Sequence, residues 1–329
     1  MNVIVIVFMI LLMSALKKSN GDFLSKDNCL AIRGAMSFVI VFGHLAQRTG
    51  GGELFSQSLK LSAICVGIYF FMSGYGLMEQ YMKRGTIYLD DFIQKRIGVL
   101  FIRYGLISLI YLVVRNYLIN DDFELITGIK QGRPIVYFSW YILELLALYL
   151  LFYLSVRVLR KTKKNYIVIA VAVGVFLIDF LLMKIGYGEY WFNSNWSFFI
   201  GILISIHKEK IIKFLRKVNT AEILLAVMTL CIMCFKVNGV IGTQVKCIVA
   251  ILTLLMLLQK IQVDNTIWEY AGKISLEIYL WQGLFMYGLR SNIVYIENDV
   301  IYSIITILGT IILSIFSNCV WKTLQSKIY

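Results

Sequence analysis

Long apolar runs separated by short polar segments occupy most of this chain. The runs are rich in Leu, Ile, Val, Phe and Tyr and contain few charges, which is typical of helices that cross a bilayer. They lie at residues 28–46, 61–82, 97–118, 139–159, 166–183, 195–206, 221–236, 244–260, 272–289 and 300–320. The pattern therefore predicts an all-α, polytopic membrane helical bundle of about ten transmembrane helices.

A further apolar run precedes these ten. Residues 3–16 are apolar or small, and Lys17 and Lys18 follow them. The run is shorter than the roughly 20 residues of a spanning helix. It is either a short interfacial helix or an additional, tilted span. We divide the chain into an N-terminal apolar segment and linker at 1–27, a transmembrane domain at 28–321 and a tail at 322–329.

Composition excludes a soluble globular protein. The chain is 59% hydrophobic and 16% charged, with a mean hydropathy of +0.77, and such a sequence is expected in a membrane. Its net charge of +13 would also suit nucleic acid, but the positions of the charges argue against that partner. Most of the 32 basic residues fall in alternate connections, at 17–33, 83–96, 157–164, 208–217, 260–273 and 322–327. The positive-inside rule places these connections and the C-terminus in the cytoplasm of a bacterial-type cell.

The first of the ten runs carries an unusual polar stripe. Between residues 30 and 46, the side chains of Arg33, Ser37 and His44 interrupt an otherwise apolar sequence. A helix turns about 100° per residue, so Arg33 and His44 lie on nearly the same face, about 16 Å apart along the axis. An anchoring arginine and a packed histidine would be the structural explanation. Ionisable groups inside a membrane are costly, however, and the aligned pair favours a functional path.

Other intramembrane charges suggest partners for this stripe. Arg96 and Arg103 are two helical turns apart, so they share a face. Arg96 is either an interfacial anchor or an anion ligand, and the deeper Arg103 requires a partner or an anion. Glu144 lies one turn beyond Trp140 and is a candidate partner for His44 or an arginine, or one half of a structural ion pair. The second run contains Tyr69, Ser73 and Tyr75. These side chains either line a cavity or lie at a close contact between helices.

No cofactor or metal motif is evident. Cys231 and Cys234 have a redox or metal-binding spacing, but they lie within an apolar run without further ligands nearby, so we interpret them as small apolar side chains. No glycine-rich phosphate loop is present. We therefore expect no metal and no tightly bound cofactor.

Five motifs, in order, resemble the acyltransferase-3 family of integral membrane O-acyltransferases. The first is Arg33, then ten intervening residues, then His44. The second is Phe-Phe-Met-Ser-Gly-Tyr at 70–75, and the third is Phe-Ile-Gln-Lys-Arg-Ile at 92–97. The last two are Ser139-Trp140 followed by Glu144, and Gly-Lys-Ile-Ser-Leu-Glu-Ile-Tyr-Leu-Trp at 272–281.

The resemblance implies transfer of an acyl group, commonly acetyl from acetyl-CoA, to a hydroxyl of a cell-surface or exported carbohydrate. His44 would be the catalytic base or acyl carrier, because imidazole suits proton transfer near pH 7, and Glu144 would orient it. Four cations would bind the acyl-CoA phosphates, namely Arg33, Lys95, Arg96 and Arg103. The remaining cavity-lining residues would be Ser37, Tyr69, Ser73, Tyr75, Trp140, Tyr279 and Gln282.

The chain departs from the family pattern in two places. A second arginine and a proline usually follow the position of Arg96, where this chain has Val99 and Ile102. A histidine often follows the Tyr-Leu-Trp motif, where this chain has Gln282. Without that histidine, more of the predicted chemistry rests on His44. The alternatives are a transporter or flippase for an anionic or polyprenyl-linked glycan, with His44 as a proton relay, and a non-catalytic membrane subunit of the glycan-assembly machinery.

Overall fold

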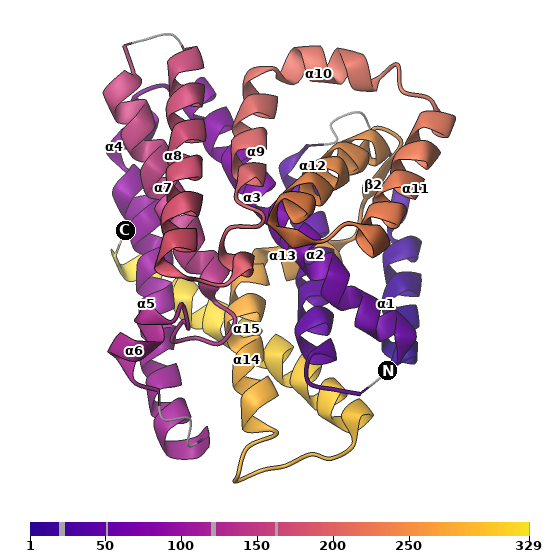
Figure 1. Ribbon diagram of the computed structural model, residues 1–329, viewed down its shortest axis with the longest axis vertical. Helices are drawn as coiled ribbons and strands as arrows, with labels where there is room; N and C mark the ends of the chain where they lie inside the picture. Colours follow the sequence, from indigo (N-terminus) through magenta and orange to yellow (C-terminus); the bar gives the residue numbers. More distant parts are fainter. Residues whose placement is uncertain (20–23, 51, 120–122, 162–163, 329) are drawn as a thin grey trace.

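The computed structural model describes residues 1–19, 24–50, 52–119, 123–161 and 164–328. The chain is 81% helical, which confirms the all-α class (Figure 1). The first half contains α1 (Asn2–Ser14), β1 (Leu16–Lys18), α2 (Lys26–Ala46), α3 (Glu53–Arg84), α4 (Ile87–Asp90), η1 (Ile93–Gly98), α5 (Val99–Val114), η2 (Arg115–Ile119), α6 (Leu125–Lys130) and α7 (Trp140–Leu159). The second half contains α8 (Lys164–Ile185), η3 (Glu189–Trp191), α9 (Trp196–Ile206), α10 (Lys208–Leu215), α11 (Thr220–Lys236), α12 (Gly239–Leu258), β2 (Ile261–Val263), α13 (Thr266–Lys273), α14 (Ser275–Gly288) and α15 (Asp299–Ile328).

Each of the ten predicted spans coincides with helix, but not every helix is long enough to cross a bilayer alone. Within the described ranges, seven helices have the length and hydropathy of a span, or eight if α10 and α11, bent by 107°, are counted as one. The predicted spans 195–206 and 272–289 correspond to α9, with 11 residues, and to α14, with 14 residues. The second is shorter than predicted because the chain breaks at Ile274, between α13 and α14.

The N-terminal apolar run forms a short helix attached to the bundle. Helix α1 has 13 residues, and the strand that follows it pairs with β2 in antiparallel register, Leu16 opposite Val263. The Phe8 ring lies edge-on to Phe42 at 5.2 Å and to Trp268 at 5.5 Å. These contacts join the N-terminal segment to α2 and α13.

Glycines allow α2, which carries the polar stripe, to pack directly on α13. A Cβ at Gly34 would lie 2.1 Å from the carbonyl oxygen of Trp268, and a Cβ at Gly272 would lie 1.9 Å from that of Leu30. No larger residue fits at either position. Close approach of this kind is a common way for helices to associate in lipid, where the hydrophobic effect does not drive helices together. The contact brings the start of α14 next to Arg33.

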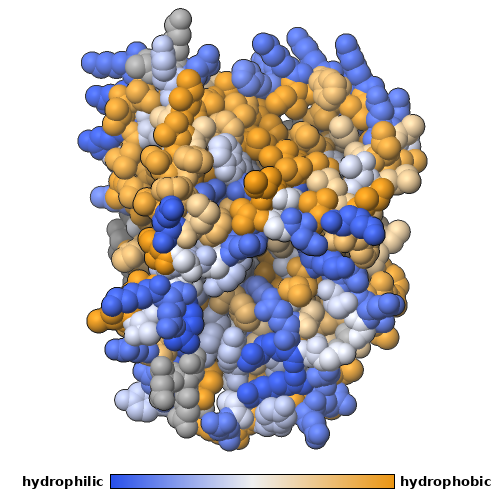
Figure 2. Space-filling view, in the orientation of Figure 1, coloured by the Kyte–Doolittle hydropathy of each residue, from blue (hydrophilic) through white to orange (hydrophobic). Residues whose placement is uncertain are grey.

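The outer surface has the polarity expected of a membrane protein. Figure 2 shows a broad apolar region between a polar rim at the α10 end and a larger polar area at the opposite end. Long apolar side chains are exposed on several helices, among them Leu109, Ile169, Leu225 and Ile312. Exposure on this scale is unfavourable in water and favourable against lipid tails. The protein is therefore a multi-pass membrane protein.

Candidate active site

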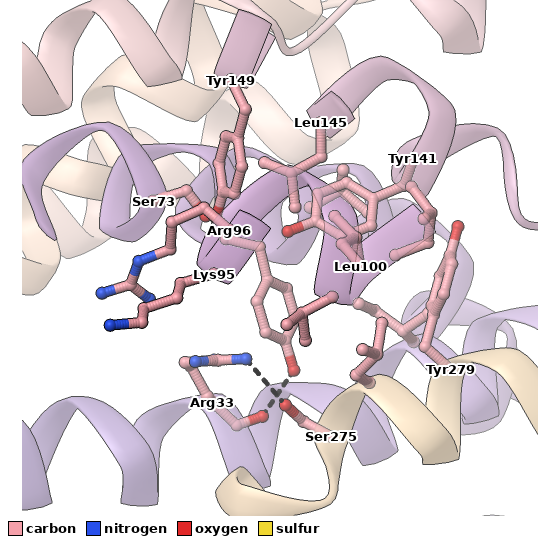
Figure 3. A pocket seen from close by; sticks show the side chains of 16 residues that line it. Arg33, Ser73, Lys95, Arg96, Leu100, Tyr141, Leu145, Tyr149, Ser275 and Tyr279 are labelled. Carbon is pink, nitrogen blue, oxygen red and sulfur yellow. Dashed lines mark hydrogen bonds between the residues drawn. The ribbon is translucent and has the colours of Figure 1, made fainter. Parts of the chain in front are cut away.

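A cavity of about 240 Å³ lies among α2, α3, η1, α5, α7 and α14. Its basic residues are Arg33, Lys95 and Arg96, and Figure 3 shows their side chains on one side of the cavity, with Tyr279 on the opposite side. The family position usually held by a second arginine is Val99, which also lines this cavity. The positive charge of its wall therefore comes from three side chains rather than four.

The Arg33 side chain is held in place, but its guanidinium still has an unpaired donor that could bind an anion. Its Nη2 donates to Ser275 Oγ at 3.1 Å, and the hydroxyl of Tyr69 donates to its backbone carbonyl at 2.6 Å. Its guanidinium carbon lies 5.7 Å from the centre of the Tyr69 ring. The buried Nε has no hydrogen-bond partner among the described residues. A buried, unpaired donor is costly, so an anion in the cavity would relieve that cost.

Lys95 and Arg96 are on η1, a π-helical segment, and both side chains are exposed. Lys95 pairs with Asp91 at 2.6 Å, and the two side chains are 57% and 50% exposed. The hydrogen bond from Lys95 and its positive charge lower the pKa of the Asp91 carboxyl. Exposed pairs of this type contribute little stability. Lys95 can therefore leave Asp91 for an anion at small cost.

His44 lies beside a second cavity, of about 380 Å³, beyond the first. The imidazole is 8% exposed and stacks on the Phe138 ring, with centroids 4.0 Å apart and planes at 9°. Its Nδ1 is 3.0 Å from Gln282 Oε1. Gln282 Nε2 donates to the Tyr279 carbonyl oxygen at 3.1 Å, which fixes the orientation of the amide. Nδ1 therefore carries the proton, and Nε2 has the free lone pair.

The two cavities share part of their walls. Ile40, Val66 and Tyr279 line both of them, and we call these three residues the neck. Ile40 is one turn before His44 on α2, and Arg33 is about two turns before Ile40. The order along this path is therefore the cationic cavity, the neck, the imidazole and the second cavity.

Trp140 and Tyr190 give the second cavity an aromatic wall, with ring centroids 5.7 Å apart. Gln47 and Asn193 add amides to its lining. Of the other predicted lining residues, Tyr69 and Ser73 line the cationic cavity. Three of the predicted lining residues line neither cavity. The Ser37 hydroxyl donates to the Gly34 carbonyl, the Tyr75 ring packs 6.1 Å from that of Phe71, and Gln282 contacts the His44 imidazole instead.

The structure does not bring Glu144 to His44. The Glu144 carboxylate, 2% exposed, accepts a hydrogen bond from Asn195 Nδ2 at 2.8 Å. The same amide donates to Asp179 at 2.9 Å. The polar side chain at hydrogen-bonding distance from the imidazole is Gln282 instead.

Arg103 also lies apart from the cationic cavity. It forms an ion pair with Glu277 at 2.8 Å, and its guanidinium carbon is 4.7 Å from the centre of the Trp321 ring. These residues line a separate pocket of about 280 Å³ next to α15. The sequence predicts that Arg103 needs a partner or an anion, and in the structure that partner is Glu277 on α14.

Sequence reasoning missed two side chains that contact the predicted site residues. Phe138, which stacks on His44, is in the connection before α7, so helical periodicity gives no signal for it. Its one signal is its position directly before the Ser139-Trp140 motif. Ser275, which holds Arg33, is within the last motif, but nothing in the sequence indicates its partner.

This geometry defines a polytopic helical membrane protein in which a cationic cavity meets a cavity that contains an imidazole. Residues 31–319 match the acyltransferase-3 family, described as an acyltransferase domain. The chain therefore belongs to this family and is a membrane-bound acyltransferase-3 protein, which confirms the resemblance of its five motifs. A search of curated proteins and a search of solved structures each gave no match.

Proposed function

We propose that this protein transfers an acetyl group from cytoplasmic acetyl-CoA, or another acyl group from its CoA ester, to a hydroxyl of a cell-surface or exported carbohydrate. The observation that carries the proposal is the order of the site: cations, then the neck, then an imidazole, then a second cavity with an aromatic wall. This order matches a donor with phosphates at one end and a thioester at the other.

The donor would occupy the cationic cavity. The phosphates of coenzyme A would bind the exposed Lys95 and Arg96 at its mouth and Arg33 further in, because charge-assisted hydrogen bonds to phosphate are strong. The thioester end would then extend towards the neck. Coenzyme A would bind as a substrate that enters and leaves, rather than as a resident cofactor.

His44 would act as the general base. Its Nε2 takes the proton of the acceptor hydroxyl while the hydroxyl oxygen attacks the thioester carbonyl carbon. The C–S bond then breaks, the acyl group remains on the acceptor oxygen, and the departing sulfur takes the proton from the imidazolium. Gln282 would keep the imidazole in the tautomer that this step needs. Gln282 thus has the orienting role that the sequence assigned to Glu144.

The acceptor would bind in the second cavity. Sugar rings pack their C–H faces on aromatic rings and exchange hydrogen bonds with amides, and Trp140, Tyr190, Gln47 and Asn193 provide both. The acceptor would be a polysaccharide or a lipid-linked glycan supplied by a partner from the glycan-assembly machinery.

The test uses membranes of cells that produce the protein, supplied with radiolabelled acetyl-CoA. We expect free coenzyme A to appear in proportion to acetylated carbohydrate, identified by mass spectrometry, and neither product in membranes without the protein. Export of carbohydrate that depends on the protein, without coenzyme A release, would establish a transporter instead. Carbohydrate assembly that depends on the protein and shows neither effect would establish a non-catalytic subunit.

A further inference from the structure

The neck separates the cationic cavity from His44. Its residues come from three helices: Ile40 from α2, Val66 from α3 and Tyr279 from α14. They are 2%, 5% and 7% exposed, and they belong to one packed hydrophobic cluster. The wall that the two cavities share therefore consists of branched and aromatic side chains, and their bulk limits the width between the cavities.

The neck is also held firmly. The Tyr279 hydroxyl donates a hydrogen bond to the carbonyl oxygen of Phe138, and the Tyr279 ring packs edge-on against that of Tyr141 at 5.5 Å. Ile40 and Val66 are β-branched residues within helices, and such side chains keep one preferred rotamer. Close-packed interiors do not expand freely, so the side chains of the neck are expected to keep their positions.

The direction of entry decides which part of the donor meets the neck first. The cations bind the phosphate end of an acyl-CoA, so the thioester end points towards the neck. The acyl group lies beyond the sulfur and is the leading end of the molecule. It must pass Ile40, Val66 and Tyr279 before the thioester carbonyl reaches His44.

We propose that the neck formed by Ile40, Val66 and Tyr279 selects the acyl group by its width, admitting linear acyl groups and rejecting those branched next to the carbonyl. This inference rests on the proposed acyl transfer. A linear chain passes in single file, and its far end emerges into the second cavity of about 380 Å³. A branch beside the carbonyl widens the acyl group, which must pass the neck before the carbonyl carbon reaches His44.

Butyryl-CoA and isobutyryl-CoA are the probes that separate width from size, because they are isomers with equal carbon counts. Each is supplied to membranes that contain the protein, and coenzyme A release and acylated carbohydrate are measured. Misfit of one methyl group in an apolar site changes rates by about 10- to 200-fold. We expect the intact protein to prefer the butyryl donor by a factor within that range.

Val66→Ala removes two methyl groups from the neck and should raise the ratio of isobutyryl to butyryl transfer by about tenfold. Val41→Ala is the matched control, because Val41 is a buried valine of α2, 1% exposed, that lines neither cavity. That control should keep the ratio of the intact protein. Ile40→Val, which removes a single methyl group, is the milder second variant for use if Val66→Ala does not fold.

Three results would decide the matter. Equal use of the two isomers by the intact protein would overturn the selection by width, as would an unchanged ratio in Val66→Ala and Ile40→Val at normal abundance. Failure of the intact protein to transfer any acyl group, acetyl included, would instead overturn the proposed function. The acetyl-CoA reaction, run beside the isomers, keeps these outcomes apart.

Discussion

His44 has a neutral partner. In many hydrolases and transferases a carboxylate orients the catalytic imidazole, and the sequence suggested Glu144 for that role. Here the amide of Gln282 faces Nδ1, and a neutral amide orients the ring without adding a charge to the membrane interior. Burial of one more charge would be costly, which is a physical reason for glutamine at this position.

The imidazole provides the most direct prediction. His44→Ala should lower acyl transfer by about 10²- to 10⁴-fold, the usual contribution of a general base, while the protein remains folded. The measurement is transfer rate per correctly folded molecule in vesicles. His207→Ala is the control, since His207 is exposed and precedes α10. Near-normal transfer by His44→Ala at normal abundance would remove His44 from the mechanism.

Arg96 is predicted to recognise the donor rather than the transition state. Arg96→Ala should raise the KM for acetyl-CoA by roughly tenfold to a hundredfold, the equivalent of one lost charge-assisted hydrogen bond. Its kcat should change less, because phosphate contacts are shared by the ground and transition states. Steady-state kinetics would measure both constants.

Arg216→Ala is the matched control for Arg96. Arg216 is an exposed arginine just after α10 and lines neither cavity. If Arg96→Ala and Arg33→Ala both kept the KM of the intact protein, the cationic cavity would not be the donor site.

Phe138 is a residue in an unusual conformation at the site. Its φ of 65° is in the left-handed region, which bulky residues rarely adopt. The conformation places its ring on His44 and its carbonyl oxygen at the Tyr279 hydroxyl. Backbone strain of this kind persists where surrounding contacts hold it, often at functional sites. The strain fits a role for Phe138 in closing the site around the imidazole.

At the scale of elements, two glycines of α3 have different environments although they are only two residues apart. A Cβ at Gly74 would lie 2.1 Å from the carbonyl oxygen of Phe198 on α9, whereas a Cβ at Gly76 would meet no atom within 4 Å. Gly74→Ala should separate α3 from α9 and lower the melting temperature in detergent. Gly76→Ala should be neutral or stabilising by about 0.5–1 kcal/mol, because alanine favours helix. Equal melting temperatures for the two variants would contradict this packing.

The ion pair between α5 and α14 is a second element contact that can be tested. Glu277 is 2% exposed in its pair with Arg103, which is 17% exposed. Arg103→Met leaves a buried carboxylate alone and should destabilise the protein by about 3–5 kcal/mol. The double variant Arg103→Met with Glu277→Leu should recover most of that loss, since apolar replacement of a buried pair is often tolerated. Melting curves should give a lower melting temperature for Arg103→Met than for the double variant. The reverse order would exclude a structural role for the ion pair.

At the scale of the whole molecule, charge predicts orientation. The C-terminal end of α7 and helix α10, which carries Lys208, Lys210 and Lys213, lie at one end of the molecule, and α6 lies towards the other (Figure 1). The positive-inside rule places the α10 end and the C-terminus in the cytoplasm. Reporter fusions after Lys161 and Arg216 should therefore read as cytoplasmic, and fusions after Gly50 and Lys130 as external. Reversed readings at any two sites would refute this topology.

The sequence by itself determined the helical membrane class, the position of each apolar helix and the alignment of Arg33 with His44. These properties depend on hydrophobic periodicity and on the 3.6-residue turn, which are local in the chain. The sequence also predicted the N-terminal apolar helix and contains the motifs that identify the family, because both are local in the chain. The apolar pattern left open whether residues 3–16 span the membrane, and it predicted about ten spans where seven or eight of the described helices have the length of one. Nothing in the pattern of 272–289 reveals the break at Ile274.

Only the tertiary structure decided which side chains meet. Gln282 rather than Glu144 reaches His44, Glu277 pairs with Arg103, and Phe138 enters the site from a connection. Each of these contacts joins residues more than 90 positions apart in the sequence, and each depends on how two elements are rotated and crossed. Glycine contacts such as that of Gly34 with α13 set those crossings. The division of the site into two cavities that share the neck therefore arises from helix packing and not from any local pattern in the sequence.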